Sequence, residues 1–290
     1  MKQYHITIEP SDIDAAHDII IAHIQSLAFP IESWLEDELF ESKVYRFICE
    51  NRCIGYCAVA DATLTFFYVE PKYRRYAPSL LERAVSDFNI TRVRVMTQDA
   101  EICTLIAEWH YDTQKVGCIF SDTGLIEREE TLCADFITAL PKDISDIRDL
   151  AGDFFDPPSG GFETLEHRIA CGTIFMLKQK KTLLGCGIVE KLRVCPDVVS
   201  IGMIVGKEHR QKGAARTLLL RLKEWAKSSG LTPVAGCWYY NTLSRKSLES
   251  AGFTVTSIVY DAILKGKENL PLRTGNPPGE LVINEECCPK

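Results

Sequence analysis

The fold of this chain is decided by the sequence Val205-Gly-Lys-Glu-His-Arg210-Gln-Lys-Gly213-Ala-Ala215. An apolar run typical of a strand precedes it, and a long stretch with apolar residues at helical spacing follows it. Between a strand and a helix, this turn is predicted to point successive backbone N–H groups of residues 211–215 into one concavity, which suits an anion. Gly213 would let a diphosphate approach the backbone closely, and Arg210 and Lys212 add positive charge.

The residues after this loop give it a context. A strand is predicted at 234–239, a helix at 242–250 with Asn241 at its start, and a final strand at 255–264 after Gly252-Phe253. This order of elements, with a strand, an anion-binding turn, a helix, a second strand and then an Asn, resembles that of the GNAT (N-acetyltransferase) superfamily. The resemblance covers about residues 131–264.

The resemblance implies a binding site for acetyl-CoA as co-substrate. The loop would bind the coenzyme A pyrophosphate, the backbone of the preceding strand would pair with pantetheine, and the Asn would contact the cofactor arm. Applied to this sequence, the cofactor-binding residues are Ile204, Val205, Arg210, Gln211, Lys212, Gly213, Ala214, Ala215, Asn241 and Ser244.

The same arrangement occurs twice in the chain. The segment 47–60 resembles 176–189, and both are interpreted as strand, polar turn and strand, with Gly55 and Gly185 opening the second strand. Each hairpin is preceded by a strand and a helix. It is followed by three more strands, with one helix between each strand and the next. The prediction is an α/β (α+β) fold of two fused GNAT-like domains, each a mixed sheet flanked by helices, at 1–125 and 131–264. Residues 265–290 are predicted to form a loose tail or a lid strand.

The first copy is degenerate at the positions that would bind the cofactor. Its loop, 69–79, has no glycine, and Pro78 lacks an N–H donor. Asp99 stands where the second copy has Asn241, and its charge would repel phosphate. The first copy is therefore expected not to hold coenzyme A, and to support the second.

The catalytic residues depart from the family pattern. Many members place a Tyr seven residues after the Asn as proton donor to the leaving thiolate, and Leu248 stands there. The carboxylate that some members carry early in the fourth strand would fall at Val199 or Ser200. We expect Tyr240, at the end of the fifth strand, to act as the acid, and Glu190, at the end of the third, as the base. Cys237 is either an acyl-accepting nucleophile or, more simply, a buried strand cysteine.

Two functions remain open. The first is an N-acetyltransferase that catalyses direct attack of a primary amine, on a small molecule or peptide, upon acetyl-CoA in a ternary complex. The alternative, suggested by Leu248, is a non-catalytic protein that binds or senses coenzyme A. A scaffold with two dead copies is disfavoured by the intact loop.

The amino-acid composition argues against several other classes of protein. The 290 residues carry a net charge of −7, so no basic footprint for nucleic acid is present, and no apolar run reaches the ~20 residues of a membrane span. Without a secretory leader at its start, the chain is expected to be cytoplasmic. Twelve cysteines show neither a C-x-x-C pair nor four-ligand spacing, so no metal site is expected. The oligomeric state stays open.

Charge is unevenly divided between the copies. Residues 1–130 carry a net charge of −10 and residues 131–290 a net of +3. Acidic residues cluster at Glu32, Glu36, Asp37, Glu38 and Glu41. The cluster could attract a cationic amine, but a solvated helix face is the simpler interpretation.

Overall fold

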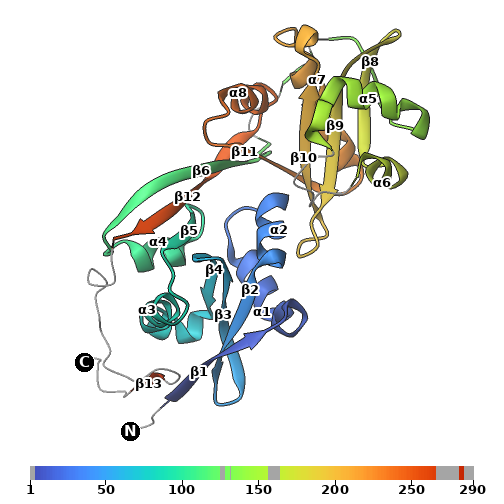
Figure 1. Cartoon of the computed structure of the whole chain (residues 1–290). Helices are drawn as coiled ribbons and strands as arrows, with labels where there is room; N and C mark the ends of the chain where they lie inside the picture. Colours follow the sequence, from blue (N-terminus) through green and yellow to red (C-terminus); the bar gives the residue numbers. More distant parts are fainter. Residues whose placement is uncertain (1–3, 125–127, 131, 156–163, 266–280, 284–290) are drawn as a thin grey trace. The chain divides into compact units, whose positions relative to one another are not determined.

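The strands fall into two units, each built around a mixed sheet (Figure 1). The computed structural model describes residues 4–124, 128–130, 132–155, 164–265 and 281–283. The first unit comprises residues 1–117 and 257–290, and the second comprises residues 118–256. We describe each unit by itself.

The first unit has the strand order β13-β1-β2-β3-β4-β5-β12. Its strands are β1 (Tyr4–Ser11), β2 (Lys43–Cys49), β3 (Arg52–Ala60), β4 (Thr63–Val69), β5 (Arg92–Met96), β12 (Thr254–Leu264) and β13 (Leu281–Ile283). Its helices are α1 (Ile13–Ser26), α2 (Ser33–Glu41), the 3-10 helix η1 (Pro71–Tyr76), α3 (Ala77–Asp87) and α4 (Ala100–Ile106). Its core includes Phe47, Phe67 and Leu80, all buried.

The second unit has the strand order β6-β11-β10-β9-β8-β7. Its strands are β6 (Tyr111–Ser121, which enters the unit at Cys118), β7 (Asp135–Thr138), β8 (Ile174–Gln179), β9 (Thr182–Lys191), β10 (Val198–Val205) and β11 (Thr232–Trp238). Its helices are α5 (Ile144–Ala151), α6 (Leu165–Ala170), α7 (Ala214–Ser228) and α8 (Thr242–Ser250), with 3-10 turns η2 (Pro141–Asp143), η3 (Gly152–Phe154) and η4 (Lys207–His209).

The final strand of the second copy completes the sheet of the first unit. β12 pairs antiparallel with β5, from Val259 opposite Met96 to Ile263 opposite Arg92. The compact units change over at 117/118 and 256/257, while the domain limits 1–125 and 131–264 stay a prediction from the sequence. The tail also contributes to this sheet, because β13 pairs with β1; the rest of it, including Cys287 and Cys288, lies outside the described residues.

The repeat seen in the sequence is present in the structure. In both copies the hairpin carries a β-bulge at the same place, between Phe47 and Ile48 in one and between Leu177 and Lys178 in the other. Gly55 and Gly185 sit opposite these bulges, inside the second strand. A Cβ at either glycine would collide with a backbone carbonyl of the next strand, which explains why both positions lack a side chain.

Helices cover both faces of the second sheet. The helix α7 packs on β9 and β10, and a Cβ added at Gly187 would meet Leu222 of that helix. The neighbouring residue Ile188 turns to the other face and packs in the core beneath α5 and α6, together with Ile204. Since alternate strand residues point to opposite faces, β10 presents one set of side chains to each helical layer.

The acidic cluster lies on and just before helix α2, which agrees with the helix expected there but not with its expected exposure. Glu36 is buried, with 2% of its surface exposed, and Glu32 is buried as the N-cap that accepts a hydrogen bond from the Trp34 backbone. Glu38 binds Arg94 at 2.7 Å. The interpretation as a solvated face is therefore wrong for Glu32 and Glu36.

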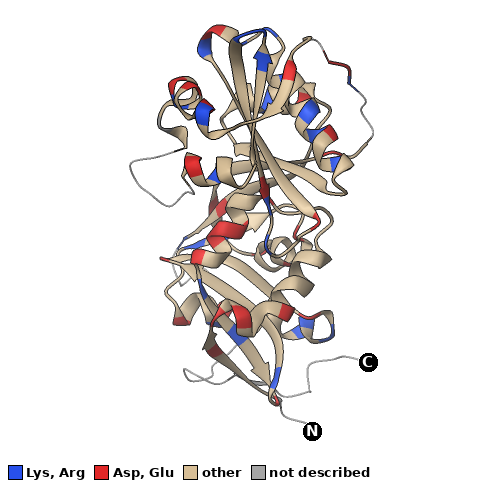
Figure 2. Ribbon diagram, turned by 90° about the vertical axis from the view of Figure 1, so that its right-hand side faces the viewer, with Lys and Arg blue, Asp and Glu red and all other residues tan. Residues whose placement is uncertain are grey.

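Short segments coloured for Lys or Arg and for Asp or Glu are scattered over the described ribbon, and none of the basic segments there is long (Figure 2). Among the described helices, none has the length and apolar character of a membrane span.

Candidate functional site

The strands β10 and β11 separate along their length and leave a gap in the second sheet. They pair in parallel only where Val198–Ser200 face Thr232–Val234. Beyond Ser200, β10 stays paired with β9 but no longer with β11. One edge of the last five residues of β10 therefore faces open space.

The backbone groups along this free edge can be identified from the pairing with β9. Gly206 donates its N–H to Leu184 of the preceding strand at 3.0 Å. In an antiparallel pair, backbone groups of alternate residues face the partner strand. The peptide groups of Ile204 and Gly202 therefore face β9. Those of Met203 and Val205 turn into the gap.

The loop after β10 presents further N–H groups. Gly213 is the N-cap of α7 and has φ +88°, a left-handed conformation that favours glycine. The first backbone bond of the helix runs from Thr217 to the carbonyl of Gly213. The N–H groups of the first turn have no acceptor within the helix, and they lie at the positive end of its dipole. Such an arrangement of N–H groups suits an anion.

The loop after β10 and the gap beside β10 form one cleft of about 830 Å³. It is formed by the end of β10, the loop, the first turn of α7 and one face of α8. Its lining residues are Met203, Ile204, Val205, Arg210, Gln211, Lys212, Gly213, Ala215, Arg216, Asn241, Leu243, Ser244, Lys246, Ser247 and Ser250.

The cleft is positively charged. Four of its described lining side chains are basic and none is acidic. Arg210 donates to the Val205 carbonyl at 3.2 Å, and Lys212 donates to the Glu208 carbonyl at 2.8 Å, so both also hold the shape of the loop. The Nε atom of Arg216 is buried and has no hydrogen-bond partner among the described residues.

Asn241 begins helix α8 at the edge of the cleft. Its side-chain oxygen accepts a hydrogen bond from the Ser244 backbone at 3.1 Å, which caps the helix. Because the oxygen is used in the cap, the NH₂ group is the part of this side chain that can donate to a ligand.

Nine of the ten residues predicted to bind a cofactor line this cleft. Ala214 is buried behind the first turn and does not line it. The sequence analysis missed Met203, Arg216, Leu243, Lys246, Ser247 and Ser250. The last four lie on the predicted helix after Asn241 at spacings of three, four and seven residues, so helical periodicity alone could have placed them on one face.

Glu190 lies where the two strands begin to separate. It stands opposite Ser200, the last residue of β10 that pairs with β11. Its carboxylate is 3.6 Å from Arg168 of α6, and its side chain is 37% exposed. Glu190 is thus on the face of the sheet that α5 and α6 cover.

Tyr240 lies at the other end of the gap. The strand β11 ends at Trp238, so the predicted extension to Tyr239 is wrong, and both tyrosines belong to the turn before α8. Tyr240 is 77% exposed and is not part of the cleft lining. It is six residues beyond Val234, the partner of Ser200.

Cys237 is a poor nucleophile at neutral pH. Burial, together with the nearby Cys118 thiol, raises the pKa of Cys237 to about 11. Because the thiolate is the reactive form, this argues against the nucleophile; Cys237 is a strand cysteine, but half-buried rather than buried.

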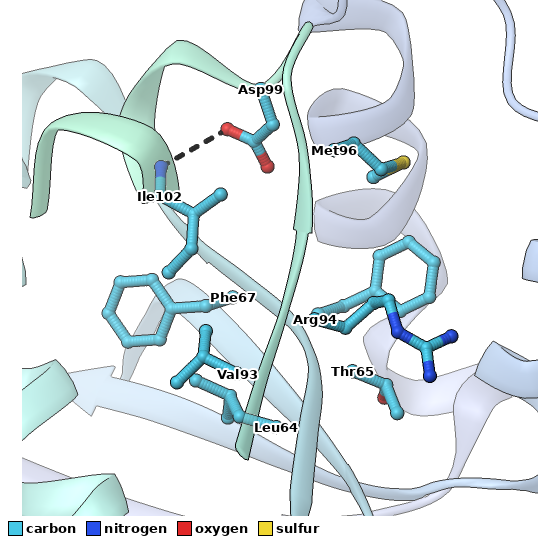
Figure 3. A pocket seen from close by; sticks show the side chains of 9 residues that line it. Leu64, Thr65, Phe67, Val93, Arg94, Met96, Asp99 and Ile102 are labelled. Carbon is cyan, nitrogen blue, oxygen red and sulfur yellow. Dashed lines mark hydrogen bonds between the residues drawn. The ribbon is translucent and has the colours of Figure 1, made fainter. Parts of the chain in front are cut away.

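The first unit has a gap in the same place, but it is filled. Its strands β4 and β5 pair only at Thr63–Arg92 and Leu64–Val93 before they separate. The cavity left there holds about 10 Å³, space for no more than a water molecule. Figure 3 shows Phe67 and Ile102 pointing into this space, with Asp99 above them.

Asp99 is bound within the first unit. One carboxylate oxygen caps α4 through the N–H groups of Glu101 and Ile102. The other lies 3.0 Å from Nε2 of the buried His23, whose Nδ1 is 2.9 Å from the hydroxyl of Tyr56. Pro78 is the second residue of α3, so the helix start that would form an anion site lacks one N–H donor.

A metal site is absent from the part of the chain that the structure describes, where His, Cys, Asp and Glu form no group of three or more suited to an ion.

Comparison with known proteins agrees with this arrangement. Residues 12–123 match the family model described as "Acetyltransferase (GNAT) domain", and residues 143–253 match "Acetyltransferase (GNAT) family". Comparison with curated proteins gives no match.

Several solved structures share the fold. An acetyltransferase from the GNAT family of Colwellia psychrerythraea superposes with a TM-score of 0.77 at 18% identity, covering 89% of this chain and 99% of that one. A GCN5-related N-acetyltransferase from Sphaerobacter thermophilus gives 0.58 at 14% identity, covering 90% and 96%. A tandem GNAT protein from the clavulanic acid biosynthesis pathway gives 0.57 at 13% identity, covering 89% and 98%. At sequence identities this low, the similarity to these structures shows a shared fold and nothing more.

Proposed function

Two domains of the GNAT acetyltransferase family in tandem make this chain an acyltransferase, and we propose that its second domain transfers the acetyl group of acetyl-CoA to a primary amine. The observation that carries the proposal is the cleft of the second unit, where a free strand edge runs directly into an anion-binding loop. This combination suits a long ligand that has a peptide-like arm at one end and phosphates at the other.

The residues of the cleft fit acetyl-CoA. The N–H groups at the start of α7, with the positive charge around them, would hold the diphosphate. The peptide groups of Met203 and Val205 that face the gap would pair with the amides of pantetheine, as a further strand would, apart from the Val205 carbonyl, which accepts a hydrogen bond from Arg210. The buried, unpartnered Nε of Arg216 indicates that a ligand is needed to complete this site.

Acetyl-CoA supplies an activated thioester when bound. The chain must then provide a group that takes the proton of the amine, since a lysine-like amine is mostly protonated at neutral pH. Glu190 is our candidate because it lies on β9 opposite Ser200, where β10 stops pairing with β11, and on the face that carries α6; it does not itself line the cleft. Tyr240 remains the predicted acid, and its position in the turn before α8 is tested separately below.

The proposed function is tested by thiol release from acetyl-CoA over a panel of small-molecule and peptide amines. With an accepted amine, Glu190→Gln should lower kcat by about 10² to 10⁴ and leave acetyl-CoA binding unchanged. Glu166→Gln is the matched control, because Glu166 is a half-exposed carboxylate of α6 that pairs with Arg148. Equal effects of the two substitutions would contradict a base role for Glu190.

The second candidate function is a coenzyme A sensor without turnover. It is favoured by Leu248, which is buried in α8 where many relatives supply a tyrosine. Tight binding of acetyl-CoA with no thiol release from any amine would support the sensor and contradict the transferase.

A further inference from the structure

A buried arginine of the second unit lies beside the candidate base. The side chain of Arg168, on α6, is 8% exposed, and its Nη1 is 3.6 Å from Oε2 of Glu190, which is longer than a hydrogen bond. The guanidinium donates no hydrogen bond to any of the described residues, although it carries five N–H donors. None of its nitrogens is fully enclosed without a partner, so the exposed part of the side chain is at the guanidinium end. A buried cation that lacks acceptors in this way suits an anionic ligand.

The backbone around Arg168 is fixed. Its N–H donates to the Thr164 carbonyl at 3.0 Å, and its own carbonyl accepts from the N–H and the hydroxyl of Thr173 at 3.0 and 2.9 Å. Leu165, on the same helix, is fully buried in the core beneath α5 and α6. The guanidinium is therefore presented to Glu190 by a packed turn of helix.

The pair of Arg168 and Glu190 lies where the gap in the sheet begins. Glu190 is opposite Ser200, the last residue of β10 that pairs with β11, and 37% of its side chain is exposed. One cation and one anion thus stand side by side at this point. The other ion pair of α6, between Glu166 and Arg148, is closer, at 2.8 Å, and more exposed.

We propose, in an inference that rests on the proposed function, that the acceptor is an α-amino acid whose carboxylate binds Arg168 while its amine lies against Glu190. Standard bond lengths place the nitrogen of such an acid about 3 Å from its nearest carboxylate oxygen. This is comparable to the 3.6 Å between the two protein groups, so opposite charges would alternate between protein and ligand. The carboxylate would supply the acceptors that the guanidinium lacks, and arginine binds carboxylates through two parallel N–H bonds.

The test measures thiol release from saturating acetyl-CoA with a panel of L-α-amino acids and with the carboxamide of each. The amide keeps the amine and the side chain but lacks the negative charge. Its amine also loses a proton more readily, so intrinsic reactivity favours the amide. For an accepted amino acid, kcat/KM should nevertheless exceed that of its amide at least about tenfold, the effect of one hydrogen bond between charged groups.

Arg168→Gln should raise KM for the amino acid at least about tenfold with little change in kcat, and should leave the amide as in the wild type. Arg168→Lys should keep part of the preference, because it retains the charge without the paired N–H groups. Arg148→Gln is the matched control, since it removes an arginine of the neighbouring helix α5 that binds Glu166, and it should keep the full preference. Thermal unfolding and acetyl-CoA binding show whether each variant is folded. If Arg168→Gln does not fold, the wild-type ratio and Arg168→Lys decide.

Two results would overturn the inference. One is a wild-type ratio of acid to amide near one. The other is an equal loss with acid and amide in folded Arg168→Gln, which would make Arg168 a structural partner of Glu190. Transfer to amines that lack a carboxylate would then leave the proposed function standing. If acetyl-CoA binds but no amine of either kind releases thiol, the proposed function itself fails.

Discussion

Replacing Gly213 by Glu separates the ligand-binding role of the loop from its role as a turn. Gly213 has φ +88°, so any side chain there strains the backbone by roughly 1–2 kcal/mol. The carboxylate would also lie beside the diphosphate. Two unit charges about 5 Å apart at an effective dielectric constant of about 20 repel by about 3 kcal/mol. Even half of that repulsion weakens acetyl-CoA binding about tenfold.

Gly230 provides a matched control. It lies just past the other end of α7 with φ +73°, and a Cβ there meets no atom within 4 Å. Gly230→Glu therefore carries a similar strain and the same charge, but far from the cleft. Both variants should unfold a few degrees earlier, since about 1 kcal/mol corresponds to roughly 2–4 °C in a domain of this size.

The assay is calorimetric titration with acetyl-CoA, combined with thermal unfolding of the free proteins. Gly213→Glu should lose at least about tenfold in affinity, Gly213→Gln less, and Gly230→Glu nothing. If folded Gly213→Glu binds as the wild type does, the loop is only a turn. If Gly230→Glu loses as much affinity as Gly213→Glu, strain rather than contact explains the effect.

Three further predictions concern other parts of the chain. The wild type should titrate to one acetyl-CoA per chain, because the helix start of the first copy lacks the N–H donor of Pro78 and its Asp99 is negatively charged; two equivalent sites would refute this. The acid role predicted for Tyr240 requires kcat of Tyr240→Phe to fall by about 10² to 10⁴ with little change in KM for acetyl-CoA. A loss below about threefold would instead assign protonation of the thiolate to water. Burial raises the pKa of Asp122, but bonds from Lys227 and Lys223 outweigh it and hold that pKa below its usual range. The ionised carboxylate therefore stabilises the second unit fully above about pH 4 and loses this effect as the pH falls through its lowered folded pKa. Asp122→Asn should be less stable by about 2 kcal/mol in urea unfolding at pH 7. A difference that persists unchanged in acid would contradict the ion pair.

The loop after β10 could be predicted because its determinants are local. Gly213 permits the turn, and the apolar periodicity of residues 215–228 fixes the helix that follows. The two hairpins were equally predictable, since each has a polar turn and a glycine at the bulge.

Non-local features could not be predicted in the same way. The segment 255–264 was expected to form a strand, and it does, but strand propensity does not name a partner. Its partner is β5, and the ion pair between Arg94 and Asp261 joins residues 167 positions apart. The length over which β10 and β11 pair is likewise a tertiary property, and it places Tyr240 in a turn rather than on a strand. The burial of Glu36 on helix α2 could not be predicted either, because a charged residue on a helix is normally expected to be exposed.

The pairing of β12 with a strand of the first unit limits which truncations of this chain leave both units intact. A stop codon after residue 256 would spare every residue that lines the cleft, yet it would remove from the first unit the strand segment that pairs with β5. Deleting the first copy would in turn leave β12 without its neighbour. A duplicated domain that has lost its ligand site is normally free to disappear. Here the first copy also supplies the partner strand of β12, so we expect the two copies to be retained together.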